Sequence, residues 1–241
     1  MKKDYRILPC GDSAVTVQFG DVISPEINAR VASAAARLAD MRLDGIEDII
    51  PTYRSFTVCY DPCAIDSGAL LHALRKACKA KKDMNSGKKT VFYIPVAYGS
   101  EFGPDLHKVA AHAGITPLEV VRRHATREYM IYMLGFLPGF PYLSGMDPSL
   151  ETPRLENPRT AIPVGAVGIG GKQTGIYPIA SPGGWNLIGR TPVRPYDPQQ
   201  APPVIYKAGD IIRFVPITRA EYTRIAAEVK NGAYKIKTEA R

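Results

Sequence analysis

The densest cluster of glycine and proline in this 241-residue chain lies between residues 135 and 195. The segment holds eleven of the 21 glycines and ten of the 21 prolines, about half of each in a quarter of the length. Proline fixes the backbone angle φ, and glycine permits tight turns and close backbone approach. The segment therefore predicts short strands that are joined by tight loops.

Large aromatic side chains distinguish this segment from a flexible linker. It contains Phe136, Phe140, Tyr142, Tyr177 and Trp185, the last of which is the only tryptophan of the chain. Linkers rich in glycine or proline lack such side chains. Aromatic residues among fixed prolines and turn-forming glycines indicate loops that are held rigidly and shape a binding pocket.

The composition excludes several classes of protein. With 45% hydrophobic and 22% charged residues, the chain is expected to fold. No apolar run is long enough to cross a bilayer, and the two N-terminal lysines precede no apolar stretch, so we expect a cytoplasmic protein without a membrane partner. The net charge of +8 is concentrated at residues 76–89 and 230–241 rather than in a basic stripe, so nucleic-acid binding is not expected.

The four cysteines do not indicate a metal site. Cys10, Cys59, Cys63 and Cys78 all lie in the first third of the chain, and none forms a C-x-x-C pair. Cys59 and Cys63 with His72 would give an incomplete zinc ligand set. We therefore expect buried, reduced cysteines and no bound metal.

Residues 1–84 predict a small α/β domain. Apolar and polar residues alternate from Val15 to Phe19, which predicts a half-buried strand, and a second strand is expected from Arg54 to Tyr60. Ser24, which precedes a proline, and Asp66 are the predicted N-caps of two helices. These elements indicate a compact sheet with helices on one face.

Residues 90–241 predict a second, strand-rich domain, which gives the chain an α+β fold class. Strands are expected at residues 90–99, 129–136 and 207–216, and a short helix is expected from Thr218. A further helix is predicted to start at the capping box of residues 116–119. Short apolar segments cut by glycine and proline indicate a barrel rather than layered helices.

The run AVGIGGKQ is similar to a phosphate-binding loop but does not complete one. Ala166 and Gln173 stand where G-x-x-x-x-G-K-[ST] requires glycine and a hydroxyl residue, and Gln173 also replaces the third glycine of the dinucleotide pattern. Gly168 to Gly171 therefore form either a turn between two strands or a backbone nest that binds an anion.

Polar side chains are embedded in the same segment. Arginine suits bidentate contact with carboxylate or phosphate, and glutamine and asparagine both donate to and accept from an amide. A ligand that combines a carboxylate with a lactam, or a nucleotide phosphate, would suit this set, while surface solvation is the alternative for each residue. The candidate binding residues are Arg159, Gly170, Gly171, Lys172, Tyr177, Ser181, Trp185, Asn186 and Thr191.

The candidate catalytic residues are His124, Gln173 and Arg190. His124, near the end of a predicted helix, is the best acid–base candidate, and complementing the helix dipole is its alternative role. Asp147 and Glu128 are carboxylates without a clear partner, and neither a Ser-His-Asp order nor H-E-x-x-H is present. The residues thus predict a binding pocket with incomplete catalytic equipment.

Several long segments carry a family resemblance. MLGFLPGFPYLSGMDP and PRTAIPVGAVGIGGKQTGIYPIASPGGWNLIGRTP, preceded by GDSAVTVQFGDVISPEINARV and PTYRSFTVCYDP, resemble the B subunit of 5-oxoprolinase. The same family is called allophanate hydrolase subunit 1 and includes the kinase inhibitor KipI. The departures are slight: Gly170-Gly171 stands where many members have Ala-Gly, and PYDP stands in a run that is often more apolar.

The resemblance implies a cyclophilin-like β-barrel after the small α/β domain. It also implies ATP-dependent cleavage of 5-oxo-L-proline to L-glutamate, with ATP and Mg²⁺ as cofactors and 5-oxoprolinase subunits A and C as partners. Arg159, Arg190 and the Gly168–Gly171 turn would supply donors to developing phosphate charge. Two alternatives stay open: an inhibitor of a sensor histidine kinase, and a carboxyltransferase-like subunit in urea or allophanate metabolism.

Overall fold

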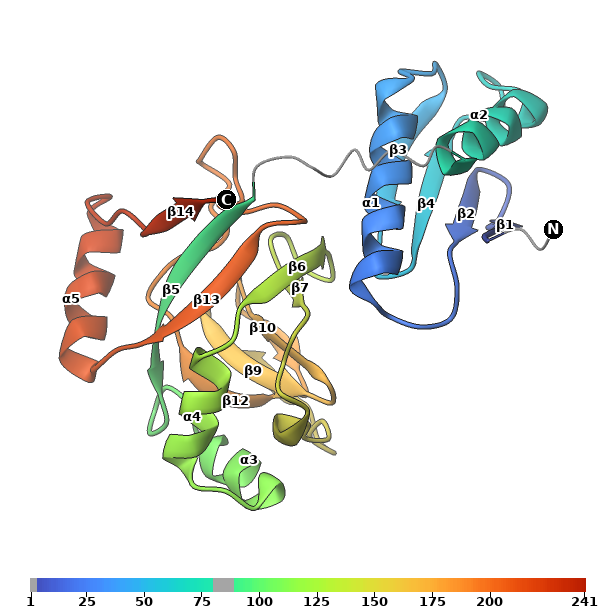
Figure 1. Cartoon of the computed structure of the whole chain (residues 1–241). Coiled ribbons are helices and arrows are strands. Elements are labelled where there is room, and N and C mark those ends of the chain that lie inside the picture. The colour runs from blue at the N-terminus through green and yellow to red at the C-terminus, as the bar shows by residue number, and fades with distance from the viewer. Residues whose placement is uncertain (1–3, 80–88) are drawn as a thin grey trace. The chain divides into compact units, whose positions relative to one another are not determined.

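The chain divides into two compact units, Met1–Gly87 and Lys88–Arg241 (Figure 1). A computed structural model describes residues 4–79 and 89–241, and each unit has a hydrophobic core of its own. The predicted boundary, between residues 84 and 90, falls mainly on residues 80–88 and so lies outside the described residues.

The first unit is a four-stranded antiparallel sheet with two helices against it. Side chains alternate across a strand, so Val15, Val17, Phe56 and Val58 all lie buried on the face that the helices cover. The strand order is β1-β2-β4-β3. The elements are β1 (Arg6–Pro9), β2 (Ala14–Gln18), α1 (Pro25–Asp40), β3 (Ile46–Pro51), β4 (Ser55–Tyr60) and α2 (Ser67–Lys79).

The predicted strands and helices of this unit are confirmed. The Ser24 hydroxyl accepts a hydrogen bond from the Ile27 N–H at 3.2 Å at the start of α1. The Asp66 carboxylate accepts one from the Ala69 N–H at 3.0 Å at the start of α2. Strands β1 and β3 were not predicted, because these edge strands are largely exposed and lack a clear apolar alternation.

The cysteines are free, as expected, but the prediction that they are buried is wrong, because none of the four is fully buried. Cys10 and Cys63 are exposed, whereas Cys59 and Cys78 are half-buried. Burial raises the pKa of the Cys78 thiol to about 11. Within residues 4–79 and 89–241, no group of three or more His, Cys, Asp and Glu side chains is placed to hold a metal ion.

The second unit is a nearly closed, barrel-like sheet, and the predicted α+β class with a barrel is confirmed. The strand path is β10-β9-β12-β5-β13-β6-β7, and β7 lies against β10, which brings the two ends of the path together. Only β5 and β13 pair in parallel along the path. The barrel strands are β5 (Thr90–Tyr98), β6 (Tyr129–Leu134), β7 (Pro141–Leu143), β9 (Ala166–Gly170), β10 (Gln173–Ile176), β12 (Asn186–Arg190) and β13 (Ile211–Pro216).

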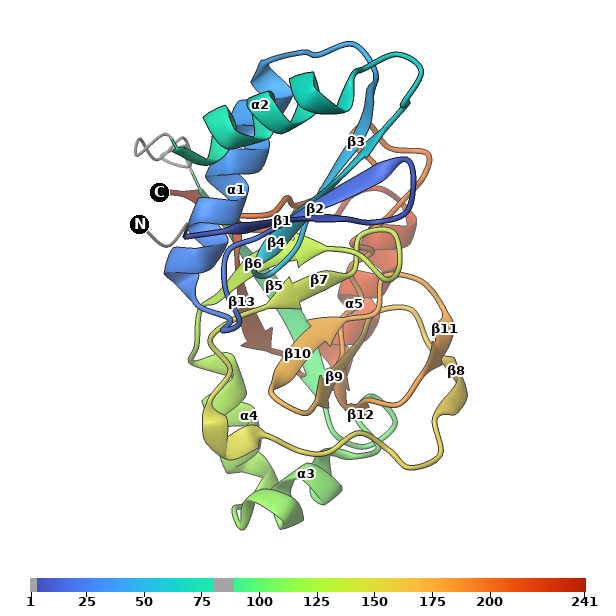
Figure 2. The same ribbon diagram turned by 90° about the vertical axis from the view of Figure 1, so that its right-hand side faces the viewer.

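Short elements surround this barrel. Helices α3 (Leu106–Ala113) and α4 (Pro117–Ala125) lie together at one end of it, and α5 (Arg219–Lys230) lies beside β5 (Figures 1 and 2). Strand β14 (Thr238–Ala240) also pairs with β5. Strands β8 (Arg159–Ile162) and β11 (Ser181–Gly183) form a separate two-stranded ribbon, and η1 (Pro148–Leu150) is a single 3₁₀ turn. None of the described helices is long and apolar enough to span a membrane.

The predicted capping box at the start of α4 is only half formed. The Thr116 hydroxyl accepts from the Glu119 N–H at 3.2 Å, but the Glu119 carboxylate binds Arg122 and Arg123 at 2.6 and 2.7 Å instead of returning to the cap. A complete capping box lies at the start of α5, where Thr218 and Glu221 satisfy each other's backbone N–H groups.

Asp105, immediately before α3, connects three elements of the second unit. One carboxylate oxygen accepts from the Leu187 N–H of β12 at 2.7 Å, and the other accepts from Arg159 Nη2 of β8 at 2.8 Å. The Asp105 carboxylate is largely buried, so both donors depend on it. This residue therefore holds the β8–β11 ribbon against the barrel.

We expect Asp105→Ala to lower the free energy of unfolding by about 2–3 kcal/mol, because it leaves a buried N–H and an arginine without their acceptor. Urea denaturation followed by Trp185 fluorescence measures this loss in the second unit. The matched control is Glu228→Ala, which breaks an exposed pair with Arg224 on α5 and is expected to cost at most about 0.5 kcal/mol. Equal effects of the two substitutions would contradict the anchoring role.

Candidate functional site

The second unit contains an aromatic-walled cavity of about 360 Å³, which we call the aromatic pocket. Its lining comes from the loop before β7, the segment between η1 and β8, the end of β10 and the β11–β12 connection. The lining residues are Phe136, Phe140, Tyr142, Arg154, Pro158, Tyr177, Pro182, Gly183, Gly184 and Trp185.

Phe140 is the centre of the aromatic wall. Its ring makes edge-to-face contacts with Phe136, Tyr142, Tyr177 and Trp185, at centroid distances of 5.6, 5.2, 5.3 and 5.5 Å. Edge-to-face pairs are the favoured geometry of aromatic side chains because the positive ring edge meets the negative ring face. The wall is thus one connected cluster rather than a set of separate rings.

Glycines provide the space that these rings occupy. A Cβ on Gly170 would overlap the Trp185 indole, and a Cβ on Gly175 would lie 3.2 Å from Trp185 and 3.3 Å from Phe140. A Cβ on Gly183 would lie 2.7 Å from the Tyr177 hydroxyl oxygen. The glycines of this segment therefore allow aromatic rings to pack directly against the backbone.

The rim of the pocket carries a strained aromatic residue. Phe136 adopts a φ of +66°, in the left-handed region that side-chain-bearing residues seldom occupy, and 64% of its surface is exposed. The turn is closed by hydrogen bonds from the Phe140 N–H to the Leu137 carbonyl at 3.0 Å and from the Gly135 N–H to the Phe140 carbonyl at 3.2 Å. Such backbone strain persists where the surrounding structure enforces it, and it is frequent at functional sites.

Arg154 is the one charged residue among those that line the pocket. Burial raises the pKa of Tyr177 to about 12 and also raises that of Tyr142, while the nearby Arg154 guanidinium opposes both shifts. The guanidinium lines the same pocket as the two phenol groups. The Trp185 backbone also lowers the pKa of Tyr177, by less than burial raises it.

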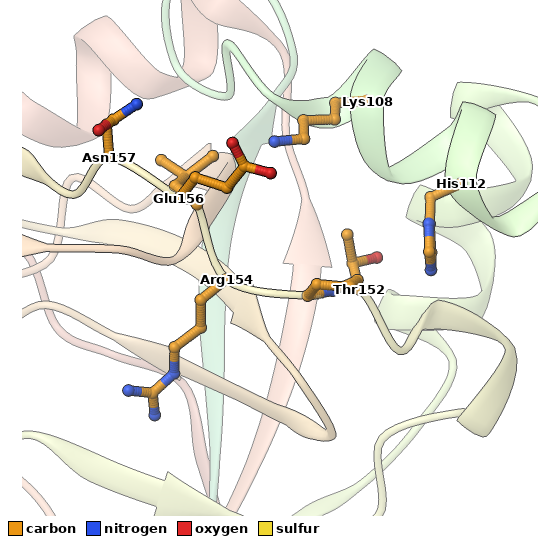
Figure 3. A pocket seen from close by; sticks show the side chains of 8 residues that line it. Lys108, His112, Thr152, Arg154, Glu156 and Asn157 are labelled. Carbon is orange, nitrogen blue, oxygen red and sulfur yellow. The ribbon is translucent and has the colours of Figure 1, made fainter.

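A second, more open hollow of about 560 Å³ lies on the other side of the same segment. Lys108 and His112 from α3 face the extended residues Thr152 to Asn157 across it (Figure 3). The Arg154 side chain points away from Lys108 and His112 (Figure 3), and it lines both hollows. This second hollow is lined by charges of both signs and has no aromatic wall.

Two of the predicted binding residues, Tyr177 and Trp185, line the aromatic pocket. Both are almost fully buried, at 2% and 5% exposure. Lys172 is exposed at the tip of the β9–β10 hairpin, and Gln173 is half-buried beside it. Ser181 is buried in β11, and its hydroxyl has no hydrogen-bond partner among the described residues.

The remaining polar candidates make structural hydrogen bonds. Arg159 binds Asp105, and Arg190 Nε donates to the Val164 carbonyl at 2.8 Å. Asn186 Nδ2 donates to the carbonyls of Pro153 and Ile169 at 2.8 and 3.2 Å, which holds the Thr152–Asn157 segment beside β9. The Thr191 hydroxyl accepts from the Val193 N–H at 3.1 Å. The ligand-contacting roles of Arg159, Arg190, Asn186 and Thr191 stay predictions.

The glycines Gly168 to Gly171 lie in a hairpin rather than in a phosphate cradle. Gly170 pairs with Gln173 across the β9–β10 turn, and Gly171 adopts a φ of +61°, which favours glycine. The Gly171 N–H donates to the Thr152 carbonyl at 2.7 Å. An anion nest needs free N–H groups, so this geometry favours the turn interpretation.

His124 is fully buried between α4 and the barrel. Its Nδ1 lies 2.8 Å from the Tyr98 hydroxyl, its Nε2 lies 2.9 Å from the Thr174 hydroxyl, and Thr174 donates to the Gly168 carbonyl. Because the single Thr174 proton goes to Gly168, Nε2 donates to Thr174 and Nδ1 accepts from Tyr98. Burial lowers the pKa of His124 to about 3, so the ring is neutral and does not complement the helix dipole. Its predicted catalytic role stays a prediction.

Three residues that line the pocket, Arg154, Pro158 and Pro182, were not predicted as site residues. Arg154 lies in the same glycine- and proline-rich segment as Arg159, and only the contact with Asp105 distinguishes the two arginines. Proline density was the available signal for Pro158 and Pro182, because a rigid wall needs fixed backbone angles.

The comparisons with known proteins identify the family. The family model described as carboxyltransferase domain, subdomain C and D, matches residues 5–206. A Bacillus subtilis relative, named as the B subunit of 5-oxoprolinase, is 42% identical over 229 residues, which cover 90% of this chain and 95% of the relative. The chain belongs to the 5-oxoprolinase B-subunit family. An Escherichia coli relative of the same name is 38% identical, and the match covers 86% of this chain and 93% of the relative.

A solved structure supports the fold of this family member. The crystal structure of the K. lactis urea amidolyase superposes with a TM-score of 0.83 at 23% identity. The match covers 98% of this chain but 16% of the much longer amidolyase chain. At this identity the likeness concerns the fold alone.

We expect the stability of this family member to depend on pH through His124. The unfolded chain binds a proton near the ordinary pKa of 6.5, whereas the folded chain binds it only near 3. The stabilisation is therefore complete above about pH 7 and is lost as the pH falls from 6.5 toward 3. Between about pH 7.5 and about pH 5, the wild type should lose about 2 kcal/mol more unfolding free energy than His124→Gln. Urea denaturation at both pH values measures the difference.

The control for this pH dependence is His112→Gln on the surface of α3, which should keep the wild-type behaviour. An identical pH dependence of His124→Gln and the wild type would contradict the assignment of a neutral, buried His124.

We also expect Gly170→Ala to destabilise the second unit by about 1–3 kcal/mol, because the new methyl group overlaps Trp185 and forces the indole to move. A red shift of the Trp185 emission should accompany the loss in urea denaturation. Gly184→Ala is the matched control, since its Cβ would meet its nearest neighbours at an ordinary 3.6 Å. Equal losses of stability in the two variants would contradict the packing of the Trp185 indole on the Gly170 backbone.

Proposed function

We propose that the chain is the B subunit of an ATP-dependent 5-oxoprolinase, which cleaves 5-oxo-L-proline to L-glutamate together with subunits A and C. The names of its relatives support membership of this enzyme system. The observation that carries the proposal is the aromatic pocket, which has groups that recognise a ligand but no nucleophile with an adjacent base among its lining residues. A pocket of this kind fits one part of a site that another chain completes.

The chemistry of the reaction agrees with this division of work. A lactam is a poor electrophile, so its hydrolysis is coupled to nucleotide hydrolysis in this proposal. The contribution of this subunit is to bind the lactam, to orient it on a rigid wall and to exclude water from one side of it. These tasks require preorganised packing rather than acid–base groups. The aromatic cluster around Phe140 supplies this packing.

The Gly168–Gly171 turn does not favour an ATP phosphate site in this subunit. The Gly171 N–H is already bonded to Thr152, and no group of three metal-ligating side chains occurs within the ranges that the structure covers. Magnesium nucleotides need carboxylate or phosphate oxygens around the ion and free N–H donors around the phosphates. In our proposal, a partner subunit therefore supplies the nucleotide site.

A second candidate function is a carboxyltransferase-like role in urea or allophanate metabolism. It is favoured by the description of the matching family model, carboxyltransferase domain, subdomain C and D. Urea and allophanate are small planar amides that would also fit an aromatic wall. The two candidates differ in substrate, so an activity assay that compares 5-oxo-L-proline with urea and allophanate separates them.

We expect the purified chain alone to be inactive, and its mixture with subunits A and C to release ADP and glutamate only when 5-oxo-L-proline is present. Coupled assays for ADP and glutamate measure both products. The controls are the two partner subunits without this chain, and the full mixture with urea or allophanate in place of 5-oxoproline. Full activity of the partners alone would overturn the subunit role, and turnover of urea or allophanate instead would favour the second candidate.

The predicted catalytic residues are tested in the same mixture. Gln173→Ala and Arg190→Ala should reduce kcat strongly if these side chains act on the substrate. Thermal denaturation of each variant distinguishes such an effect from misfolding, because Arg190 also bonds the Val164 carbonyl. Unchanged turnover in both variants would retire their catalytic assignment.

A further inference from the structure

The aromatic pocket combines apolar walls with a single cation at its rim. Phe136, Phe140 and Trp185 present ring faces and edges, and Arg154 adds a guanidinium to the lining that the phenols of Tyr142 and Tyr177 share. Aromatic walls favour a flat, largely apolar ring, and a guanidinium favours a carboxylate or phosphate. The lining therefore selects a ligand that carries a ring and an anionic group.

The charge of Arg154 is available to such a ligand. In the part of the chain that the structure covers, no carboxylate forms an ion pair with Arg154, whereas Arg159 in the same segment is bound to Asp105. The positive charge also excludes one common class of ligand, because aromatic cages that bind ammonium groups need a rim without a cation.

The size of the pocket limits the ligand further. About 360 Å³ lies at the low end of the range of small-molecule sites. One small ring with its substituents fits this volume, whereas a nucleotide or a folded peptide segment needs more. The Trp185 ring packs directly on the backbone of Gly170 and Gly175, and the Tyr177 ring packs on that of Gly183. This contact keeps the cavity from widening.

Tyr177 offers a hydrogen-bond donor at the wall. The Trp185 backbone N–H near its oxygen lowers the pKa of Tyr177, against the larger effect of burial, and its hydroxyl proton has no acceptor among the described residues. This phenol is protonated at neutral pH, and burial raises its pKa further, to about 12. A protonated, oriented hydroxyl is suited to donate to a carbonyl oxygen.

We propose that the aromatic pocket is the binding site of a small cyclic amide that carries a carboxylate. Arg154 holds the carboxylate, the ring lies on the wall around Phe140, and Tyr177 donates to the ring carbonyl. Among ligands of this class, the choice of 5-oxo-L-proline rests on the function proposed above. Arg154 is then the residue that discriminates the substrate from a neutral lactam.

The single tryptophan makes this proposal directly testable in the isolated full chain. Trp185 lines the pocket, so titration with 5-oxo-L-proline should change its fluorescence in a saturable manner. Pyrrolidin-2-one, the same ring without the carboxylate, should bind about tenfold more weakly, because it lacks the charged hydrogen bond to Arg154. Ligand-observed NMR on the same samples detects binding that leaves the fluorescence unchanged.

Substitutions at position 154 separate recognition from general packing. Arg154→Gln should weaken 5-oxo-L-proline about tenfold and leave pyrrolidin-2-one unchanged, so that the preference between the two ligands disappears. Arg154→Lys keeps the charge but loses the planar fork, and its affinity should be intermediate. Arg213→Gln, which removes an exposed arginine of β13, is the matched control and should behave as the wild type.

The proposal would be overturned by no binding of 5-oxo-L-proline to the wild type by either method, by equal affinity for the two lactams, or by the same loss in Arg213→Gln as in Arg154→Gln. A change of Trp185 emission that partner subunits cause, without any lactam binding, would instead assign the pocket to a segment of the partner and overturn it as well.

The experiment is independent of the proposed enzyme function. Binding in the isolated chain requires no turnover, so lactam binding without activity of the reconstituted mixture would refute the enzyme role and leave the pocket assignment standing. In an active mixture, Arg154→Gln should raise KM for 5-oxo-L-proline about tenfold with little change in kcat, as loss of uniform binding predicts. Activity with an unchanged KM would refute the pocket and leave the enzyme role.

Discussion

The indole of Trp185 rests directly on the backbone of Gly170 and Gly175, and the geometry of the candidate site depends on this packing. Two strands of the barrel must lack side chains at these positions before the indole can lie flat against them. The indole then supports Phe140, which contacts the other rings of the wall. A methyl group on either strand would displace the whole aromatic cluster, because its members touch one another in sequence.

Buried polar groups in the second unit hold its helices and strands in position. Asp105 connects α3, β8 and β12, and the neutral imidazole of His124 connects α4 with the barrel through Tyr98 and Thr174. The Asp105 carboxylate and both ring nitrogens of His124 are paired, which is the condition under which buried polar groups stabilise a fold. With these groups committed to structure, Arg154 remains as the charge at the aromatic wall. A rigid wall with one available cation suits binding, and it agrees with a subunit whose partners supply the remaining chemistry.

The regular elements that were predictable carry strong local signals. Ser24 and Asp66 cap their helices as expected, and β2 and β4 show the alternation that a half-buried strand requires. The exposed edge strands β1 and β3 lack this alternation, so nothing in the sequence distinguished them from loops. The capping box at Thr116 formed only in part, because Arg122 and Arg123 compete for the Glu119 carboxylate one turn further on.

The residue pattern was sufficient to predict a pocket in this segment, its aromatic character and five of the residues that line it, Phe136, Phe140, Tyr142, Tyr177 and Trp185. Rigid loops and large rings are encoded locally, through the fixed φ of proline and the open backbone of glycine. The choice between Arg154 and Arg159 was not encoded in this way. Asp105, 54 residues earlier in the chain, binds Arg159 and leaves Arg154 at the pocket. Likewise, the glycines of AVGIGGKQ serve an aromatic ring instead of a phosphate, because the fold brings Trp185 onto Gly170 and pairs the Gly171 N–H with Thr152. Contacts between distant segments carry no local sequence signal, so folding alone assigned these roles.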